Sequence, residues 1–140
     1  NNHSYITHHL NQWNILPRPS ITMTIALKLT SLFVNDQKKA LKFYTETIGF
    51  VKLKDKPAGA HRWLTVGQQG SDFEMVLEPN VHEAAKAYQE AIFGDGLPAT
   101  MLFVDDMDNE YKRLKEAGVE FQGEPMEYDG NKLAKFNDTC

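Results

Sequence analysis

The sequence predicts one α+β domain in which a β-α-β-β-β module occurs twice, with the second copy lacking its last strand. Three observations support this prediction. They are an internal repeat, a glycine at the end of each repeated helix, and short strands of alternating polarity. The paired modules are expected to form a cupped mixed sheet.

The internal repeat aligns residues 28–50 with residues 98–121. Each copy begins with an apolar strand that ends in Leu-Phe-Val, at 32–34 and again at 102–104. An apolar face with helical spacing follows in each copy. Because all of these features recur in the same order, we interpret the repeat as a duplicated β-α unit.

Both repeated helices have predictable ends. Asp36 and Asp106 follow the two strands, and a carboxylate there can accept hydrogen bonds from the free amides of a first helical turn. Gly49 and Gly118 come after the helical faces, and glycine adopts a left-handed backbone at little cost. These signals predict one helix between each aspartate and the glycine that follows it.

Further strands and one more helix complete the two modules. The strands are predicted near 49–53, 61–66, 73–78, 119–122 and 132–137, with an Asp129-Gly130 loop before the last. A linking helix over about 81–93, which begins after Asn80, separates the two modules. We therefore expect modules over about 27–79 and 97–140.

Residues 1–24 have a different character from the remainder of the chain. They are rich in Asn, His, Thr and Ser, and they show no steady helical or strand periodicity. They also lack the basic and apolar regions of a secretory signal. We expect a polar leader outside the core, with the folded domain spanning 25–140.

Composition and charge exclude several classes of protein. Hydrophobic residues make up 41% of the chain and charged residues 24%, and the net charge is −4 with no basic stripe, which argues against nucleic-acid binding. No apolar run is long enough to span a membrane. A single cysteine, Cys140, cannot form an internal disulfide, so we expect a cytoplasmic protein.

The motifs of the repeat resemble a known family. A strand ending in V-x-D, then Phe43-Tyr44 and Ile48-Gly49-Phe50, in a duplicated frame, is similar to the vicinal oxygen chelate superfamily. This superfamily contains glyoxalase I, bleomycin-resistance proteins and extradiol dioxygenases. The resemblance implies two modules curled into a cup that holds ligands or metals, and a homodimer.

The metal positions of that family can be compared with this chain residue by residue. The resemblance places the expected ligands at Leu29, Val76 and Ala99, and the last ligand on a strand beyond the turn that begins at Asp138. Leu, Val and Ala side chains have no lone pairs to donate to a metal ion. We therefore expect no metal site and no cofactor.

Strand alternation then identifies the side chains that face the cup. Three aromatic rings, a thioether and two carboxylates are expected there, a combination that favours flat, hydrophobic or cationic compounds. The candidate ligand-binding residues are Phe33, Trp63, Glu74, Glu78, Met101 and Phe103. The alternative interpretation is that these side chains belong to the core.

These observations favour a metal-independent small-molecule binding protein of the glyoxalase/bleomycin-resistance type. No residue is nominated as catalytic, since no nucleophile has a visible activating partner. Two alternatives stay open. One is a metal-dependent lyase or dioxygenase of the same superfamily, and the other is a structural or interaction module whose cup is filled by its own side chains.

Overall fold

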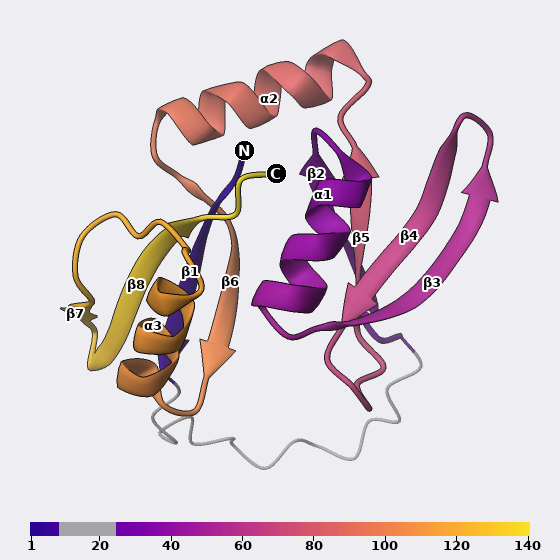
Figure 1. The fold of residues 1–140 in the computed structure, drawn as a ribbon. Coiled ribbons are helices and arrows are strands. Elements are labelled where there is room, and N and C mark those ends of the chain that lie inside the picture. Colours follow the sequence, from indigo (N-terminus) through magenta and orange to yellow (C-terminus); the bar gives the residue numbers. More distant parts are fainter. Residues whose placement is uncertain (9–24) are drawn as a thin grey trace.

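The structure is a computed structural model that describes residues 1–8 and 25–140. Within these residues the chain forms two four-stranded sheets, three α-helices and a π-helical turn (Figure 1). The strands are β1 (His3–His8), β2 (Leu29–Val34), β3 (Val51–Ala58), β4 (His61–Gly67), β5 (Glu74–Pro79), β6 (Pro98–Val104), β7 (Met126–Tyr128) and β8 (Asn131–Asn137). The helices are α1 (Gln37–Lys42), η1 (Phe43–Thr47), α2 (Glu83–Gly94) and α3 (Met107–Glu116).

The first-module sheet has the strand order β2-β5-β4-β3. β5 lies parallel to β2, and β4 lies antiparallel to both β5 and β3. β4 pairs with β5 at only two positions, so most of the β3–β4 hairpin extends away from the sheet (Figure 1). The predicted β-α-β-β-β module is confirmed.

The second-module sheet has the order β6-β1-β8-β7. β1 lies between β6 and β8, parallel to the former and antiparallel to the latter. The structure therefore differs from the expectation that the chain's first residues lie outside the core, because Ile6 is only 1% exposed. β1 also fills the strand position that was expected to be empty. The rest of the expected leader, 9–24, lies outside the described residues.

The helix ends follow the predicted chemistry with one exception. Asp36 Oδ1 accepts hydrogen bonds from the amides of Lys38 and Lys39, and Asp106 caps α3 in the same way. In α2 the cap is His82 rather than Asn80, because the His82 ring accepts from the Ala84 amide at 3.1 Å. The helices of the two repeated β-α units therefore begin where the sequence predicts.

One further prediction about the strands is wrong. Residues 119–122 form no strand and contribute only an isolated bridge between Phe121 and Phe136. The edge strand is instead β7, which reaches β8 through the Asp129-Gly130 turn. Both turn residues have positive φ, 49° and 73°, as a two-residue hairpin turn requires.

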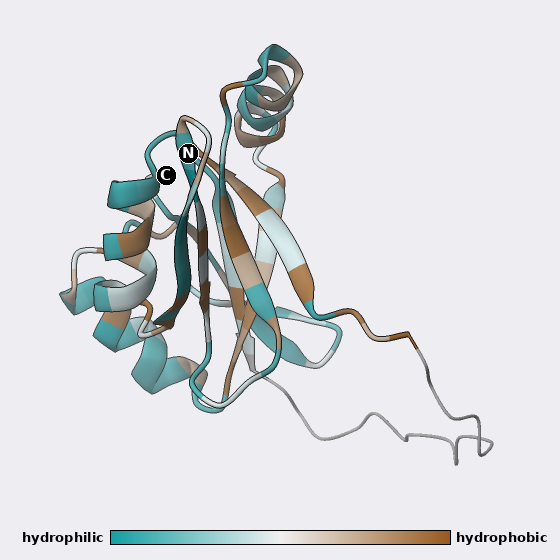
Figure 2. Cartoon of the chain, turned by 90° about the vertical axis from the view of Figure 1, so that its right-hand side faces the viewer, coloured by the Kyte–Doolittle hydropathy of each residue, from teal (hydrophilic) through white to brown (hydrophobic). Residues whose placement is uncertain are grey.

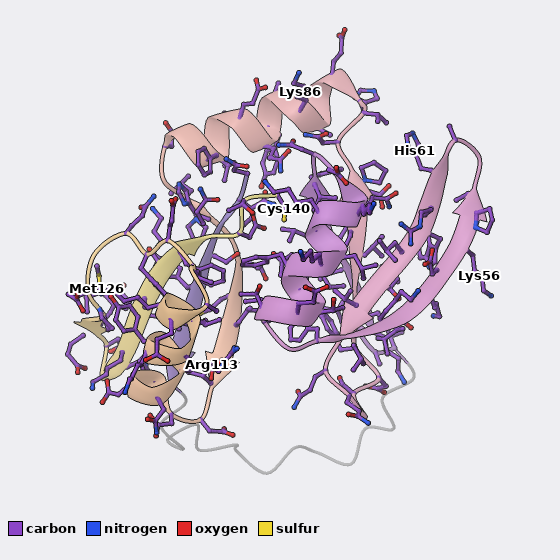
Figure 3. All side chains as sticks on the ribbon, in the orientation of Figure 1. Lys56, His61, Lys86, Arg113, Met126 and Cys140 are labelled. Carbon is purple, nitrogen blue, oxygen red and sulfur yellow. The ribbon has the colours of Figure 1, made fainter. Side chains whose placement is uncertain are left out.

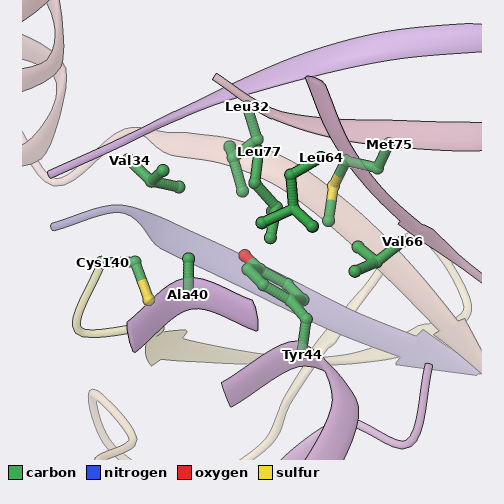
Figure 4. Packing of buried hydrophobic residues seen from close by; sticks show 9 residues of the cluster. All are labelled: Leu32, Val34, Ala40, Tyr44, Leu64, Val66, Met75, Leu77 and Cys140. Atoms are coloured by element: carbon green, nitrogen blue, oxygen red, sulfur yellow. The ribbon is translucent and has the colours of Figure 1, made fainter. Parts of the chain in front are cut away.

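Helices α1 and α3 cover one side of both sheets, and α2 lies at the top on the opposite side (Figures 1 and 2). One buried cluster packs the first-module sheet against α1 and η1 (Figure 4). A second cluster packs the other sheet against α3. Phe43 and Ile48 contact both clusters, so the two modules share one helix-side core.

A buried carboxylate fixes β1 against the rest of the fold. Asp138 is fully buried and accepts hydrogen bonds from the backbone and side-chain amides of Asn2, from the Tyr44 hydroxyl at 2.8 Å and from the Cys140 amide. Burial, followed by the Asp138 charge, raises the pKa of Tyr44. The chain's two ends therefore meet at one hydrogen-bonded hub (Figure 1).

Candidate functional site

The side of each sheet that faces away from α1 and α3 is called its open face here. On β2, Leu32 and Val34 point into the helix-side core, which leaves Leu29, Ser31 and Phe33 on the open face. The same alternation holds along β4, β5 and β6, whose helix-side cluster members are Leu64, Val66, Met75, Leu77, Leu102 and Val104. The predicted alternation of side chains between the two faces of these strands is therefore correct.

A pocket of about 430 Å³ lies on the open face of the second-module sheet. Large apolar or aromatic side chains from four strands dominate its wall, and we call it the aromatic pocket. It is lined by Tyr5, Thr7, Met101, Phe103, Met126, Tyr128, Asp129, Asn131 and Leu133. Of the six residues predicted to bind a ligand, Met101 and Phe103 are part of it.

Several lining residues of this pocket are exposed despite their apolar character. Tyr128 is 69% exposed, Phe103 62% and Met126 54%. Single exposed apolar residues are ordinary, but a contiguous group usually marks a binding surface. The aromatic pocket is therefore the strongest candidate site among the residues that the structure describes.

The open face of the first-module sheet has a different chemistry. Glu74 lies there as predicted, but its carboxylate accepts from Lys54 Nζ at 2.6 Å and from Thr65 Oγ1 at 2.8 Å. These hydrogen bonds, that of Lys54 foremost, lower the pKa of Glu74. Trp63 is 40% exposed on the same face. The Glu74 charge is therefore compensated within the protein.

The remaining predicted residues are separated from the aromatic pocket. Phe33 lines a pocket of about 340 Å³ beneath α2, together with Ser31, Tyr88 and Ala99. Glu78 lies opposite Phe33 in the strand register, at the far end of β5 from Glu74. The structure therefore distributes the six predicted residues over three places.

The aromatic pocket and the β3–β4 hairpin lie at opposite ends of the molecule. Met126 is at the outer edge of the second module, whereas His61 and Lys56 are at the end of the β3–β4 hairpin (Figure 3). A single ligand of ordinary size therefore cannot bridge the aromatic pocket and the hairpin end within one chain.

Sequence reasoning missed Tyr5, Met126 and Tyr128. The last two precede Asp129-Gly130, and a two-residue turn of this type predicts a strand on each side, so that signal could have identified them. Tyr5 lies in the short segment His3–His8, which the polar composition assigned to the leader. Both errors came from treating short strands as loop.

The expected metal positions lie on the open faces. Leu29, Val76 and Ala99 occupy them, and none of these side chains can coordinate a metal ion. Within residues 1–8 and 25–140, no three His, Cys, Asp or Glu side chains gather closely enough to hold one. Metal independence stays a prediction.

The comparisons with known proteins agree with this fold. The family model described as Glyoxalase/Bleomycin resistance protein/Dioxygenase superfamily matches residues 26–140. The chain is 52% identical over 116 residues to YurT of Bacillus subtilis (strain 168), covering 80% of this chain and 90% of that protein. In the described part of the chain, no helix has the length and apolar character needed to cross a membrane.

Two solved structures are similar in both sequence and fold. The crystal structure of UcmS2 has a TM-score of 0.71 and 32% identity, covering 82% of this chain and 91% of that one. The structure of TnmS3, described as an antibiotic binding protein from Streptomyces sp. CB03234, has a TM-score of 0.60 and 34% identity. The aligned region covers 76% of this chain and 82% of the TnmS3 chain.

Proposed function

Because the chain belongs to the glyoxalase/bleomycin resistance protein/dioxygenase superfamily, we propose that it is a metal-independent protein that binds a hydrophobic small molecule. The observation that carries the proposal is the aromatic pocket. Six of its side chains, listed above, present large apolar or aromatic surfaces. TnmS3, a 34% identical protein described as antibiotic binding, supports a ligand of this kind.

The charges around the pocket refine the class of ligand. Glu74 is paired with Lys54, so it is a poor partner for a cationic ligand. Asp129 lines the aromatic pocket itself, as Phe103 and Tyr128 do. A flat cation there would gain both a carboxylate and aromatic faces. The proposed ligand therefore includes hydrophobic cations, with Asp129 as their charge partner.

We also propose a homodimer. The strand missing from the second module gives no reason for a dimer, because β1 fills its place and pairs on both sides. The proposal is supported instead by the exposed apolar side chains on both open faces, among them Leu29, Trp63 and Phe103. A second copy that covers them would enclose the pocket. Sedimentation at micromolar concentration tests this, and a mass near one chain contradicts it.

We also propose a cytoplasmic location. Cys140 is buried, and burial raises the pKa of its thiol to about 12. Such a thiol is held in the unreactive protonated form. A single buried cysteine is consistent with a reducing compartment.

A binding screen tests the proposed function. Neutral and cationic hydrophobic dyes are titrated with the protein and followed by fluorescence. We expect Tyr128→Ala and Met101→Ala to weaken the best dye roughly fivefold to tenfold each, because each removes part of the pocket wall. Val81→Ala is the matched control, since Val81 is 69% exposed and outside this pocket.

The same preparation distinguishes the alternatives. Stoichiometric Zn, Ni, Fe or Mn in purified protein would overturn the metal-independent proposal and favour a lyase or dioxygenase. Failure of every dye to bind, with wild-type stability intact, would favour a structural module. Equal weakening by Val81→Ala would show that binding takes place outside the aromatic pocket.

A further inference from the structure

The second-module sheet obtains its second strand from outside the segment that matches the family. The orders β2-β5-β4-β3 and β6-β1-β8-β7 are equivalent, and both β5 and β1 run parallel to the first strand of their sheet. β1 therefore has the structural role of β5. The family match covers 26–140, so β1 lies beyond it.

From Ser4 onward, the strand registers give β1 residues counterparts in β5. Ser31 pairs with Val76 in the first-module sheet, and Met101, the counterpart of Ser31 in the repeat, pairs with Tyr5. Tyr5 thus takes the place of Val76 on the open face. A phenol replaces an isopropyl group at equivalent positions of the two sheets.

Tyr5 brings a hydrogen-bond donor into an apolar wall. Its side chain is half-buried and lines the aromatic pocket between Met101 and the β8 side of the sheet. Within residues 1–8 and 25–140, its hydroxyl has no hydrogen-bond partner. By contrast, the side-chain amide of Asn131 in the same pocket already donates to the Asp129 carbonyl. Tyr128 in the same pocket also carries a hydroxyl, but it is 69% exposed and so stays accessible to water. Tyr5 is therefore the less hydrated phenol, and the one that gains most from an acceptor on the ligand.

We infer that the ligand carries a hydrogen-bond acceptor, such as a ketone or ether oxygen, that Tyr5 recognises. This inference rests on the proposed function and deepens it. A hydrophobic compound with such an acceptor satisfies the phenol and the apolar wall together, whereas a hydrocarbon leaves the phenol unpaired in a partly dry site. The selectivity of the pocket is thereby set by β1.

A matched pair of probes tests the inference on the full chain. Fluorene and 9-fluorenone have the same flat ring system and differ by one carbonyl oxygen. Each competes with a fluorescent dye already shown to occupy the aromatic pocket. We expect 9-fluorenone to bind about five times more tightly than fluorene, the gain typical of one neutral hydrogen bond.

Substitution identifies the donor. Tyr5→Phe retains the ring and the strand, and we expect it to abolish the preference while fluorene affinity stays within about twofold. Tyr88→Phe is the control, because Tyr88 is exposed on α2 and lies outside this pocket, and it should retain the preference. Tyr5→Leu also lacks the hydroxyl, so it should likewise lose the preference for 9-fluorenone. Thermal melting confirms that each variant folds.

The outcomes separate the two proposals. If no dye and neither probe binds wild-type protein, the proposed function fails and this inference fails with it. If dyes bind the aromatic pocket but the wild type shows no preference for 9-fluorenone, or if Tyr5→Phe retains that preference, the Tyr5 assignment alone is overturned.

Discussion

The two sheets share one strand order but are completed by different parts of the chain. The first-module sheet comes from a single stretch, 29–79, whereas the second-module sheet includes β1. The central helix-side residues of their second strands are nevertheless equally buried, with Ile6 at 1% and Leu77 at 0% exposure. The comparison shows that a module needs a parallel strand beside its first strand, wherever in the chain that strand lies.

The helix-side faces and the open faces differ in how closely they are constrained. Both helix-side faces are apolar, because each must pack against a helix in the shared core. The open faces have diverged. One carries the Lys54–Glu74 pair, and the other carries the aromatic pocket. Duplication has therefore kept the core and left the open faces free to take different chemistry.

Substitution within the two second strands is the strongest test of their equivalence. Ile6→Ala and Leu77→Ala each remove a fully buried side chain, and we expect each to lower the free energy of unfolding by about 2–5 kcal/mol. Urea denaturation measures both losses. Val81→Ala, at an exposed residue, should change the free energy of unfolding by less than about 0.5 kcal/mol. A loss as small as this for Ile6→Ala would mean that β1 is dispensable.

Loss of the hub that fixes β1 should have the next largest effect. Asp138→Ala leaves the Asn2 amides and the Tyr44 hydroxyl without their buried acceptor, so we expect a loss of about 3 kcal/mol in urea denaturation. Asp108→Ala is the control. Among residues 1–8 and 25–140, Asp108 pairs with Lys132 alone, in an exposed ion pair, and its loss should cost less than about 1 kcal/mol. Equal effects would contradict the role of the hub.

Local signals were sufficient to predict most of the fold. Asp36 and Asp106 cap their helices, and the apolar alternation placed Leu32 and Val34 correctly, because these preferences depend on neighbouring residues. β1 was missed since its place depends on pairing with strands about a hundred residues away. A short polar strand carries too weak a periodicity to reveal such a partner.

The site was less predictable than the fold for a related reason. The alternation of β6 correctly gave Met101 and Phe103, but the grouping of side chains into one pocket depends on which strands become neighbours. Glu74 faced the predicted side, yet Lys54 on β3 neutralises it. Cross-strand partners of this kind cannot be identified from the sequence until the register of both strands is known.

Acidification should affect the β1 side of the molecule first. The His3 ring stacks on Phe93 at 4.2 Å between centroids, and burial, followed by the Lys135 charge, lowers the pKa of His3. The unfolded chain therefore binds a proton at His3 at higher pH than the folded chain does. The contribution of neutral His3 is present above the ordinary pKa of 6.5 and is lost as pH falls below it.

Thermal melting at about pH 7.5 and about pH 5.5 measures this dependence, a window in which most carboxylates stay ionised. We expect the wild-type melting temperature to fall across the window and His3→Gln to show a smaller fall. The Asp138 carboxylate and the chain's amino group also act on His3, in opposite directions. His61→Gln, at the exposed end of β4, is the control. An unchanged fall in His3→Gln would contradict the assignment.

The smallest expected effect compares the chemistry of the two open faces directly. Lys54→Met removes the partner of Glu74, so the first-module face, which also carries Trp63, gains an uncompensated carboxylate. A cationic dye should then bind roughly twofold more tightly, while a neutral dye in the aromatic pocket is unaffected. Lys28→Met, which breaks the exposed pair with Asp72, is the matched control for the change in net charge. Equal gains in both variants would reflect net charge alone, whereas a gain confined to Lys54→Met means that the internal ion pair is what keeps cations from the first-module face.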